Sequence, residues 1–165
     1  MENIIIRKST HLDDGVIEEI SYKTWLGVYP NKKYGISAQD IKSLFSKKKK
    51  RTINKNRVTY VAIINNKVIG YSSGCIREGV NQLQAIYILS KYQNKGIGKM
   101  LINKLSNEFF DKNKDTVINV ATYNTNAINV YKKMGFVDTG KRFSEERFRL
   151  ESGAIIPEME LLREK

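Results

Sequence analysis

Residues 86–101 read IYILSKYQNKGIGKML, and this stretch decides the fold. An apolar run ends in a segment with two glycines, and apolar residues then recur from Ile97 to Phe109 at the spacing of one helical face. The pattern predicts a strand over Leu83–Leu89, a glycine loop, and a long amphipathic helix that begins at Ile97.

The glycine loop has the chemistry of a phosphate site. Glycines let the backbone approach a ligand closely, and a helix N-terminus directs unpaired N–H groups and the positive end of the helix dipole at one point. Lys95 precedes Gly96, and Lys99 follows Gly98, so positive charge flanks both glycines. Glycines at a strand-to-helix turn can also serve the turn alone, and the loop by itself leaves both interpretations open.

Two common nucleotide-binding patterns do not fit this loop. A dinucleotide fingerprint needs a glycine or alanine three residues after Gly98, where Leu101 stands. A P-loop needs a lysine followed by serine or threonine, whereas Lys99 is followed by Met100. The sequence therefore excludes both patterns.

The flanking segments predict a mixed α/β chain. Upstream, the expected elements are a strand over Asn3–Arg7, a helix that follows a capping box at Thr10 and Asp13 and ends before Pro30, a helix over Ser37–Phe45, and strands Val58–Ile64 and Lys67–Ile76 joined by the turn Asn65-Asn66. Downstream, they are a strand over Val117–Ala121, a helix after the turn Tyr123–Asn126 with a stop at Gly135, and strands near Phe136–Leu150 and Ile155–Leu162 separated by a turn at Ser152-Gly153. Neither a repeat nor a linker is evident, so we expect one domain over residues 1–165.

Two segments resemble signatures of the GCN5-related N-acetyltransferases, the GNAT family. The stretch Ile86–Leu101 is similar to the family's coenzyme-binding signature, an apolar strand followed by Gln/Arg-x-x-Gly-x-Gly/Ala. Downstream, Asn124–Phe136 is similar to the family's segment Asn-x-x-Ala-x-x-x-Tyr-x-x-x-Gly-Phe. The resemblance implies the family's α/β fold, a mixed and mostly antiparallel twisted sheet of roughly six to seven strands flanked by about four helices.

The resemblance also implies that acetyl-CoA binds here as a co-substrate. Main-chain groups of Ile86, Tyr87 and Ile88 would contact the acetyl group and the pantetheine arm, and the loop would cradle the pyrophosphate. Asn124 would hold the pantetheine arm, and Lys133 would reach a cofactor phosphate. The full set of expected cofactor-binding residues is Ile86, Tyr87, Ile88, Gln93, Asn94, Lys95, Gly96, Ile97, Gly98, Lys99, Asn124 and Lys133.

Tyr131 is the expected catalytic residue, which the resemblance places near the cofactor sulfur. A phenol is protonated at neutral pH and can donate to a departing thiolate. The implied reaction is direct: a neutral primary amine attacks the thioester carbonyl in a ternary complex, and a strand N–H near Ile88 stabilises the oxyanion. A covalent enzyme intermediate is not needed. Cys75, the only cysteine, has no evident histidine partner, because His11, the only histidine, lies at a predicted helix start. Without the flanking match, Tyr131 also fits a core aromatic.

Departures from the family pattern leave the general base unassigned. Family members often carry a glutamate on the strand before the loop or on the strand after it, and Gln82 and Asn119 stand at those positions. Neither is a base near neutral pH, so Glu78, another carboxylate or ordered water would take the proton of an ammonium substrate. Ser90 also replaces the proline that is common before the loop.

The acceptor is expected to be a small-molecule amine or a protein amino group, between which the sequence does not choose. Trp25, Tyr29 and Tyr34 are candidate walls of an acceptor pocket, although core packing explains Trp25 equally well. The segment from Thr24 to Pro30 faintly resembles polyamine-acetylating relatives, but a net charge of +12 disfavours a polycation.

The net positive charge also limits the kinds of partner that the protein is expected to bind. It favours an anionic partner, and the densest cluster, Lys47–Arg51, reads as a solvated connection or a phosphate-contacting patch. The longest apolar stretch falls short of the roughly 20 residues that cross a bilayer, and no Cys/His cluster has zinc-ligand spacing. We therefore expect a cytoplasmic protein without a metal, a membrane partner or a specific nucleic acid; a homodimer is allowed, although no segment marks its interface.

Two other functional classes stay open. A non-catalytic acetyl-CoA sensor would keep the glycine loop and lack a base, and a nucleic-acid-binding protein would use the basic excess. Saturable coenzyme A binding without transfer to any amine would indicate the sensor. Steeply salt-dependent binding of DNA or RNA, without coenzyme A binding, would indicate the other class.

Overall fold

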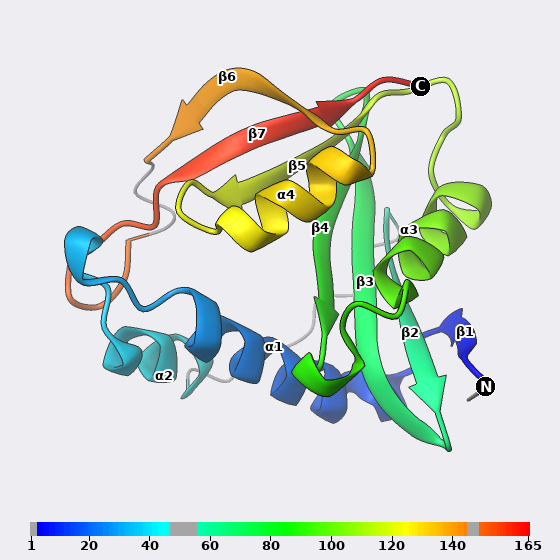
Figure 1. Ribbon diagram of the computed structural model, residues 1–165, viewed down its shortest axis with the longest axis horizontal. Coiled ribbons are helices and arrows are strands. Elements are labelled where there is room, and N and C mark those ends of the chain that lie inside the picture. Colours follow the sequence, from blue (N-terminus) through cyan, green and yellow to red (C-terminus); the bar gives the residue numbers. More distant parts are fainter. Residues whose placement is uncertain (1–2, 47–55, 145–148) are drawn as a thin grey trace. The chain divides into compact units, whose positions relative to one another are not determined.

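The computed structural model describes residues 3–46, 56–144 and 149–165, and these form seven strands and four α-helices (Figure 1). In chain order the elements are β1 (Ile5–Lys8), η1 (His11–Asp13), α1 (Asp14–Val28), η2 (Lys32–Tyr34), α2 (Ala38–Ser46), β2 (Arg57–Ile64), β3 (Lys67–Arg77), β4 (Val80–Ile88), η3 (Ser90–Tyr92), α3 (Ile97–Glu108), β5 (Thr116–Ala121), α4 (Thr125–Lys133), β6 (Val137–Phe143) and β7 (Glu158–Arg163). Every strand pair with a described register is antiparallel. The mixed α/β fold class expected from the sequence is confirmed. The basic cluster Lys47–Arg51 lies outside the described residues.

The chain divides into two compact units. In described residues, the first comprises 3–21, 56–117 and 164–165, and the second comprises 22–46, 118–144 and 149–163. The single domain expected over residues 1–165 stays a prediction.

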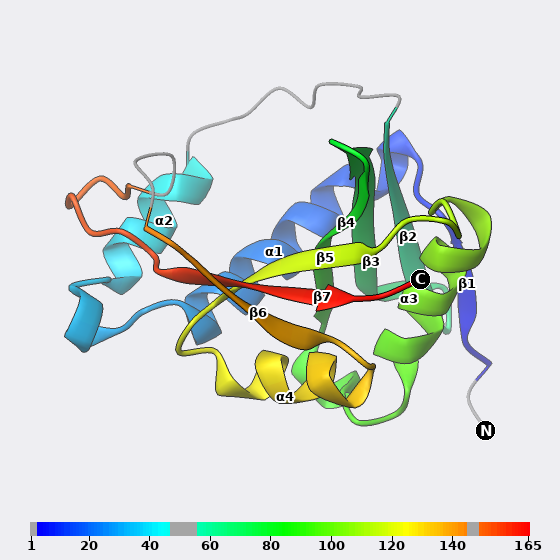
Figure 2. The same cartoon turned by 90° about the horizontal axis from the view of Figure 1, so that it is seen from above.

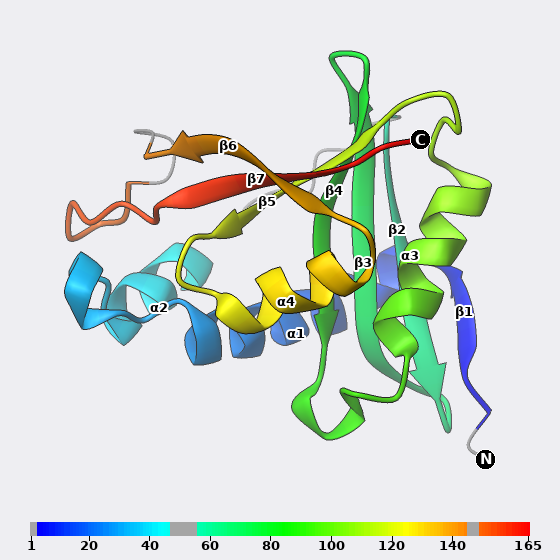
Figure 3. The same cartoon turned by 45° about the horizontal axis from the view of Figure 1, so that its top comes forward.

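The first unit is built on the strand order β1-β2-β3-β4, in which each strand is antiparallel to its neighbour (Figure 3). The β2–β3 turn is formed by Asn65 and Asn66, with φ of 48° and 61°, as the sequence predicts. Glu78 and Gly79, also at positive φ, form the β3–β4 turn. β4 therefore begins three residues before the predicted strand, because this second turn carries no sequence signal beyond one glycine.

The two faces of these strands bury different helices. Ile20 in the first half of α1 packs with Val61, Tyr71 and Ala85 on one face. α3 contacts β2, β3 and β4, and the hydroxyl of Ser72, the residue after Tyr71, donates a 3.3 Å hydrogen bond to the Leu101 carbonyl of α3. Figure 2 shows α3 and the first half of α1 on opposite sides of these strands.

A β-bulge interrupts β4 shortly before Ile86–Ile88. Ser73 pairs with Ala85 and Gly74 pairs with Leu83, so Gln84 is the extra residue on β4. A bulge bends its strand and increases the local twist. The residues from Ala85 to Ile88 therefore continue in a shifted register.

The second unit has the strand order β5-β7-β6 and a core of its own. Its buried cluster joins the end of α1, the α2 region and the segment before β7 through Tyr29, Ile36, Ile41, Ala121, Leu150 and Ile156. The predicted long strand Phe136–Leu150 is shorter, because β6 ends at Phe143; residues 145–148 lie outside the described residues. The predicted turn at Ser152-Gly153 is confirmed, with φ of 88° at Gly153.

A bidentate ion pair fixes the start of the first helical segment. Arg7 Nη1 and Nη2 donate to the Asp13 carboxylate at 2.8 and 2.9 Å, and the Thr10 main-chain N–H donates to the same carboxylate at 2.7 Å. The capping box expected at Thr10 and Asp13 therefore forms, at η1, one residue before α1 begins. The Arg7 hydrogen bonds, as the largest cause, lower the pKa of Asp13 from 3.8 to about 2.

We expect Asp13→Asn to lower the free energy of unfolding at pH 7 by up to about 2 kcal/mol. The folded pKa lies below the unfolded value, so this stability is present above pH 3.8 and is lost as the pH falls through 2. Solvent at the 43% exposed Arg7 side chain makes the figure an upper value. Urea titrations of both proteins between pH 7 and pH 2 would measure it, and a difference that stays constant over that range would contradict the assignment.

Candidate functional site

The loop between β4 and α3 is shaped by two left-handed residues. Asn94 has φ of 61° and Gly96, the N-cap of α3, has φ of 75°. Residues that alternate in this way turn successive N–H groups toward one concave side, which is a known anion-binding arrangement. The first-turn amides of α3 have no intrahelical acceptor and point in the same direction. A Cβ placed at Gly96 would meet no atom within 4 Å, so the space beside the loop is open.

Electrostatics favour an anion at this helix end. The first turn of α3 carries Lys99 and no acidic residue, which leaves the positive end of the helix dipole uncompensated within that turn. Lys91 and Lys95 hold their ammonium groups 4.9 and 5.6 Å from the centroid of the Tyr92 ring. The three lysines repel one another and the positive end of the helix dipole. A bound pyrophosphate would relieve that repulsion.

The end of β4 directs main-chain groups away from β3. Leu89 N–H donates a 2.9 Å hydrogen bond to the Ile69 carbonyl, and antiparallel pairs alternate between bonded and non-bonded. Gly70 and Ile88 are the next pair and are therefore non-bonded, so the Ile88 N–H points away from β3. The same reasoning applies to Ile86. The resemblance assigns the acetyl group and pantetheine arm to main-chain groups of Ile86, Tyr87 and Ile88. Ile86 and Ile88 direct theirs away from β3, whereas the pair Tyr71–Tyr87 between them is a bonded one, so the main-chain groups of Tyr87 face β3.

Gln93 ties the loop to the strand. Its side-chain amide donates to the Ile88 carbonyl at 2.9 Å, across η3. The amide therefore holds the strand end and the loop together. The contact of Gln93 with the cofactor stays a prediction. Ile86–Ile88 and Gln93–Lys99 are thus brought together within the first unit.

The other three expected residues lie on α4 in the second unit. The Asn124 side-chain oxygen accepts from the Ala127 N–H at 3.2 Å, so Asn124 is the N-cap of the helix. Tyr131 is 7% exposed, and its ring makes an edge contact with Phe136 at 5.8 Å between centroids. Lys133 is exposed in the last turn, where a cation also favours the helix dipole. The roles of these residues toward acetyl-CoA stay predictions.

The aromatic residues expected at an acceptor pocket are packed against one another. Trp25 and Tyr29 stack at 4.2 Å between ring centroids, and Tyr34 stacks on Tyr123 at 5.2 Å. The Tyr123 hydroxyl donates to the Tyr29 carbonyl at 2.8 Å. All four belong to the core of the second unit or pack against it, so core packing accounts for them.

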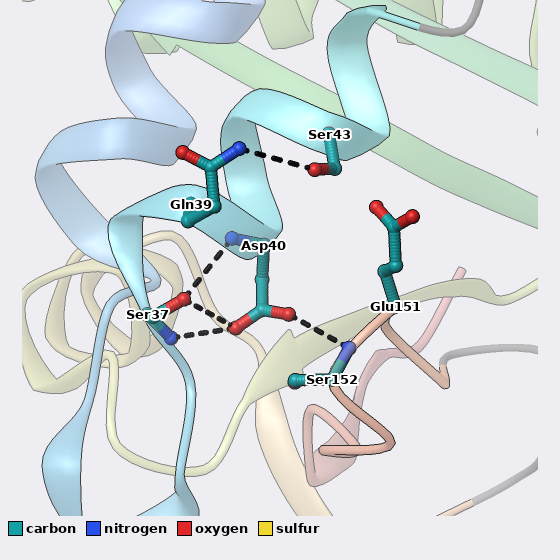
Figure 4. Close-up of a pocket in the computed structure, with 6 residues that line it drawn as sticks. All are labelled: Ser37, Gln39, Asp40, Ser43, Glu151 and Ser152. Atoms are coloured by element: carbon teal, nitrogen blue, oxygen red, sulfur yellow. Dashed lines mark hydrogen bonds between the residues drawn. The ribbon is translucent and has the colours of Figure 1, made fainter.

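A polar cavity of about 380 Å³ lies beside the start of α2 in the second unit (Figure 4). Its lining residues are Ser37, Gln39, Asp40, Ser43, Glu151 and Ser152. The buried Asp40 carboxylate accepts from the Ser37 N–H and hydroxyl and from the Ser152 N–H, and these hydrogen bonds lower the pKa of Asp40. Asp40 therefore clamps the turn near residue 152 onto α2.

Neither Cys75 nor Glu78, both in the first unit, suits a catalytic role. Burial raises the pKa of the Cys75 thiol, which leaves little thiolate at neutral pH. Glu78 sits on the β3–β4 turn, paired with Arg77, and Ile86 lies opposite Ser72, five positions or roughly 17 Å further along β3. Glu78 is thus too far to deprotonate an amine at the Ile86–Ile88 end of the strand.

Two further observations bear on function. In the residues that the structure describes, no group of three or more His, Cys, Asp or Glu side chains could hold a metal ion. Among the described helices, none is both long and apolar enough to span a membrane.

The comparisons with known proteins agree with this geometry. The sequence model of the Acetyltransferase (GNAT) family matches residues 18–136. Among solved structures, the chain is similar to the PaiA N-acetyltransferase of Thermoplasma acidophilum in complex with coenzyme A, with 18% identity, 99% of each chain covered and a TM-score of 0.68. It is also similar to a GNAT family acetyltransferase of Elizabethkingia anophelis with acetyl-CoA bound, with 22% identity, 100% of each chain covered and a TM-score of 0.58.

A third similar structure is the ribosomal-protein-S18-alanine N-acetyltransferase of Escherichia coli, with 15% identity, 98% of this chain and 93% of that chain covered, and a TM-score of 0.63. At these identities the structural likeness shows the fold, and the family match shows the family. Because that match covers well over half of the sequence, the chain belongs to the GNAT family of acetyltransferases.

Proposed function

We propose that this chain transfers the acetyl group of acetyl-CoA to a primary amine, either a small-molecule amine or a protein amino group. The observation that carries the proposal is the loop of Asn94 to Lys99, where left-handed residues, first-turn amides and lysines converge. Similar structures contain coenzyme A or acetyl-CoA, which supports the same ligand here. The phosphates would bind the loop, and the pantetheine arm would run along Ile86–Ile88.

Three residues at α4 keep the roles that the resemblance implies. Asn124 uses its oxygen to cap α4, so its contact with the pantetheine arm would come from the side-chain N–H₂ group. Lys133 would meet a cofactor phosphate, and Tyr131 would donate its phenolic proton to the sulfur.

The reaction proceeds directly in a ternary complex. The amine nitrogen attacks the thioester carbon, and the Ile88 N–H donates to the oxygen that becomes negative. The C–S bond then breaks, the sulfur takes the Tyr131 proton, and the nitrogen loses one proton to water, which gives the amide and free coenzyme A. The Tyr131 phenolate regains its proton from water. Cys75 takes no part, because its buried thiol is a poor nucleophile.

Intact-protein mass spectrometry tests this direct route. After incubation with acetyl-CoA and no amine, we expect unmodified protein; after addition of an accepted amine, we expect the acetylated amine. An acetyl group on Cys75 that is transferred to the amine would contradict direct transfer.

We expect the rate to depend on pH through the acceptor itself. Gln82 and Asn119 are not bases and Glu78 is remote. Of the two alternatives that remain, another carboxylate or ordered water, we take water as the acceptor of the ammonium proton. Below the pKa of the amine, kcat/KM should then rise about tenfold per pH unit, because the neutral fraction rises in that proportion. Profiles with two amines of different pKa measure this, and a plateau at the same pH for both would instead reveal a protein base.

A non-catalytic acetyl-CoA sensor is the second candidate function. The absence of a glutamate at positions 82 and 119, together with the remoteness of Glu78, favours it. Calorimetry would then show saturable acetyl-CoA binding, with no amine acetylated at any pH.

A further inference from the structure

Gly70 on β3 approaches the backbone of β4 more closely than any side chain would allow. A Cβ built at Gly70 would lie 2.7 Å from the Tyr87 carbonyl oxygen and 3.1 Å from the Ile88 Cα. Its φ is not in the left-handed region, so the backbone conformation does not require glycine. Glycine otherwise weakens a strand interior, and the close approach is the reason for it here.

The contact falls on the peptide group that carries the proposed oxyanion donor. The Tyr87 carbonyl points toward β3, and the Ile88 N–H of the same planar peptide points away from it. The Tyr87 oxygen and the Ile88 nitrogen therefore move together. At 2.7 Å from a backbone oxygen a methyl group does not fit, so β3 or β4 must shift, and a shift of β4 moves this N–H.

We infer that Gly70 is a positioning residue. Because it has no side chain, β3 and β4 lie close together there, and this close approach sets the position of the Ile88 N–H. The inference rests on the proposed function and assigns to it a residue outside the loop and α4. An oxyanion donor works only within a narrow range of distances, and a misplacement of 1 Å can cost about a hundredfold in rate. A smaller displacement here should cost about tenfold.

Gly74 provides a matched control on the same strand. A Cβ at Gly74 would also be too close to its neighbours, at 2.6 and 2.7 Å from ring carbons of Phe110, but these are side-chain atoms under α3. Gly74→Ala therefore repacks a ring and leaves the Tyr87–Ile88 peptide in place. Both variants should lower the melting temperature, but only Gly70→Ala should displace the Ile88 N–H.

The experiment compares Gly70→Ala with Gly74→Ala below both melting temperatures. For Gly70→Ala we expect kcat to fall about tenfold, with the KM for acetyl-CoA within threefold of the native value. For Gly74→Ala we expect kcat within twofold of the native value. In ¹⁵N-labelled protein, acetyl-CoA should shift the Ile88 amide resonance in the native chain and in Gly74→Ala, and much less in Gly70→Ala.

Equal kcat values for the two variants, or a native Ile88 response in Gly70→Ala, would overturn the inference. The amide measurement does not need turnover, so a native chain that acetylates no amine would refute the proposed function and still leave the role of Gly70 decided. If Gly70→Ala does not fold, Gly70→Ala/Ile88→Ala removes the 3.0 Å contact with Ile88 Cγ1 and keeps the contact with the Tyr87 oxygen. Its reference is Ile88→Ala alone, and the same loss of kcat is expected.

Discussion

Tyr131→Phe is expected to lower kcat for acetyl transfer at least tenfold, with little change in the dissociation constant of acetyl-CoA. The substitution removes one hydroxyl and keeps the ring, which is buried against Phe136 at 5.8 Å between centroids. Packing is therefore largely retained, and the loss falls on the proton given to the departing thiolate. Tenfold corresponds to about 1.4 kcal/mol of transition-state stabilisation, a modest share of what a general acid contributes.

Tyr60→Phe is the control for the loss of a buried phenol. Tyr60 lies in the first unit, is 4% exposed and donates to Glu108 at 3.0 Å. We expect this variant to lose stability and keep kcat within twofold of the native value. If Tyr131→Phe behaves in the same way as Tyr60→Phe, Tyr131 is a packing aromatic and the proposed acid is wrong.

Reversal of two loop charges should weaken acetyl-CoA binding at least tenfold. In Lys95→Glu/Lys99→Glu, two cations beside the first turn of α3 become anions and repel the pyrophosphate. Even at water-like screening, a unit charge a few ångströms from a phosphate is worth about 1 kcal/mol, and four units of charge change here. Calorimetry at low and high salt measures the effect, which should shrink as salt increases.

The matching control reverses two lysines beyond the other end of the same helix. Lys112→Glu/Lys114→Glu changes the total charge equally, at least about 18 Å from the loop along the 12 residues of α3. Its dissociation constant for acetyl-CoA should stay within threefold of the native value. Equal weakening by both pairs would show that net charge alone, and not the loop, attracts the ligand.

Periodicity and turn chemistry predicted most elements of the fold from the sequence. The helix predicted from Ile97 onward and the turn predicted at Asn65-Asn66 are both confirmed, because each depends on a few adjacent residues. The predicted length of β6 was wrong, because a strand pattern continued past Phe143 without a strong breaker.

The bulge at Gln84 and the close approach at Gly70 were not predicted. Both depend on the register between β3 and β4, which pairs residues far apart in sequence. A glycine inside a strand, directly after the β-branched Val68 and Ile69, is the signal that could have marked Gly70. The ion pair between Arg7 and Asp13 was also not predicted, because alternation shows which face a side chain takes and not its partner.

The most direct test of the account is release of free coenzyme A from acetyl-CoA, measured with the native chain across a panel of amines, amino acids, polyamines and peptides. We predict saturable turnover with one class of primary amine and formation of its N-acetyl product. Saturable acetyl-CoA binding with no release of coenzyme A for any acceptor would contradict the enzyme and favour the sensor.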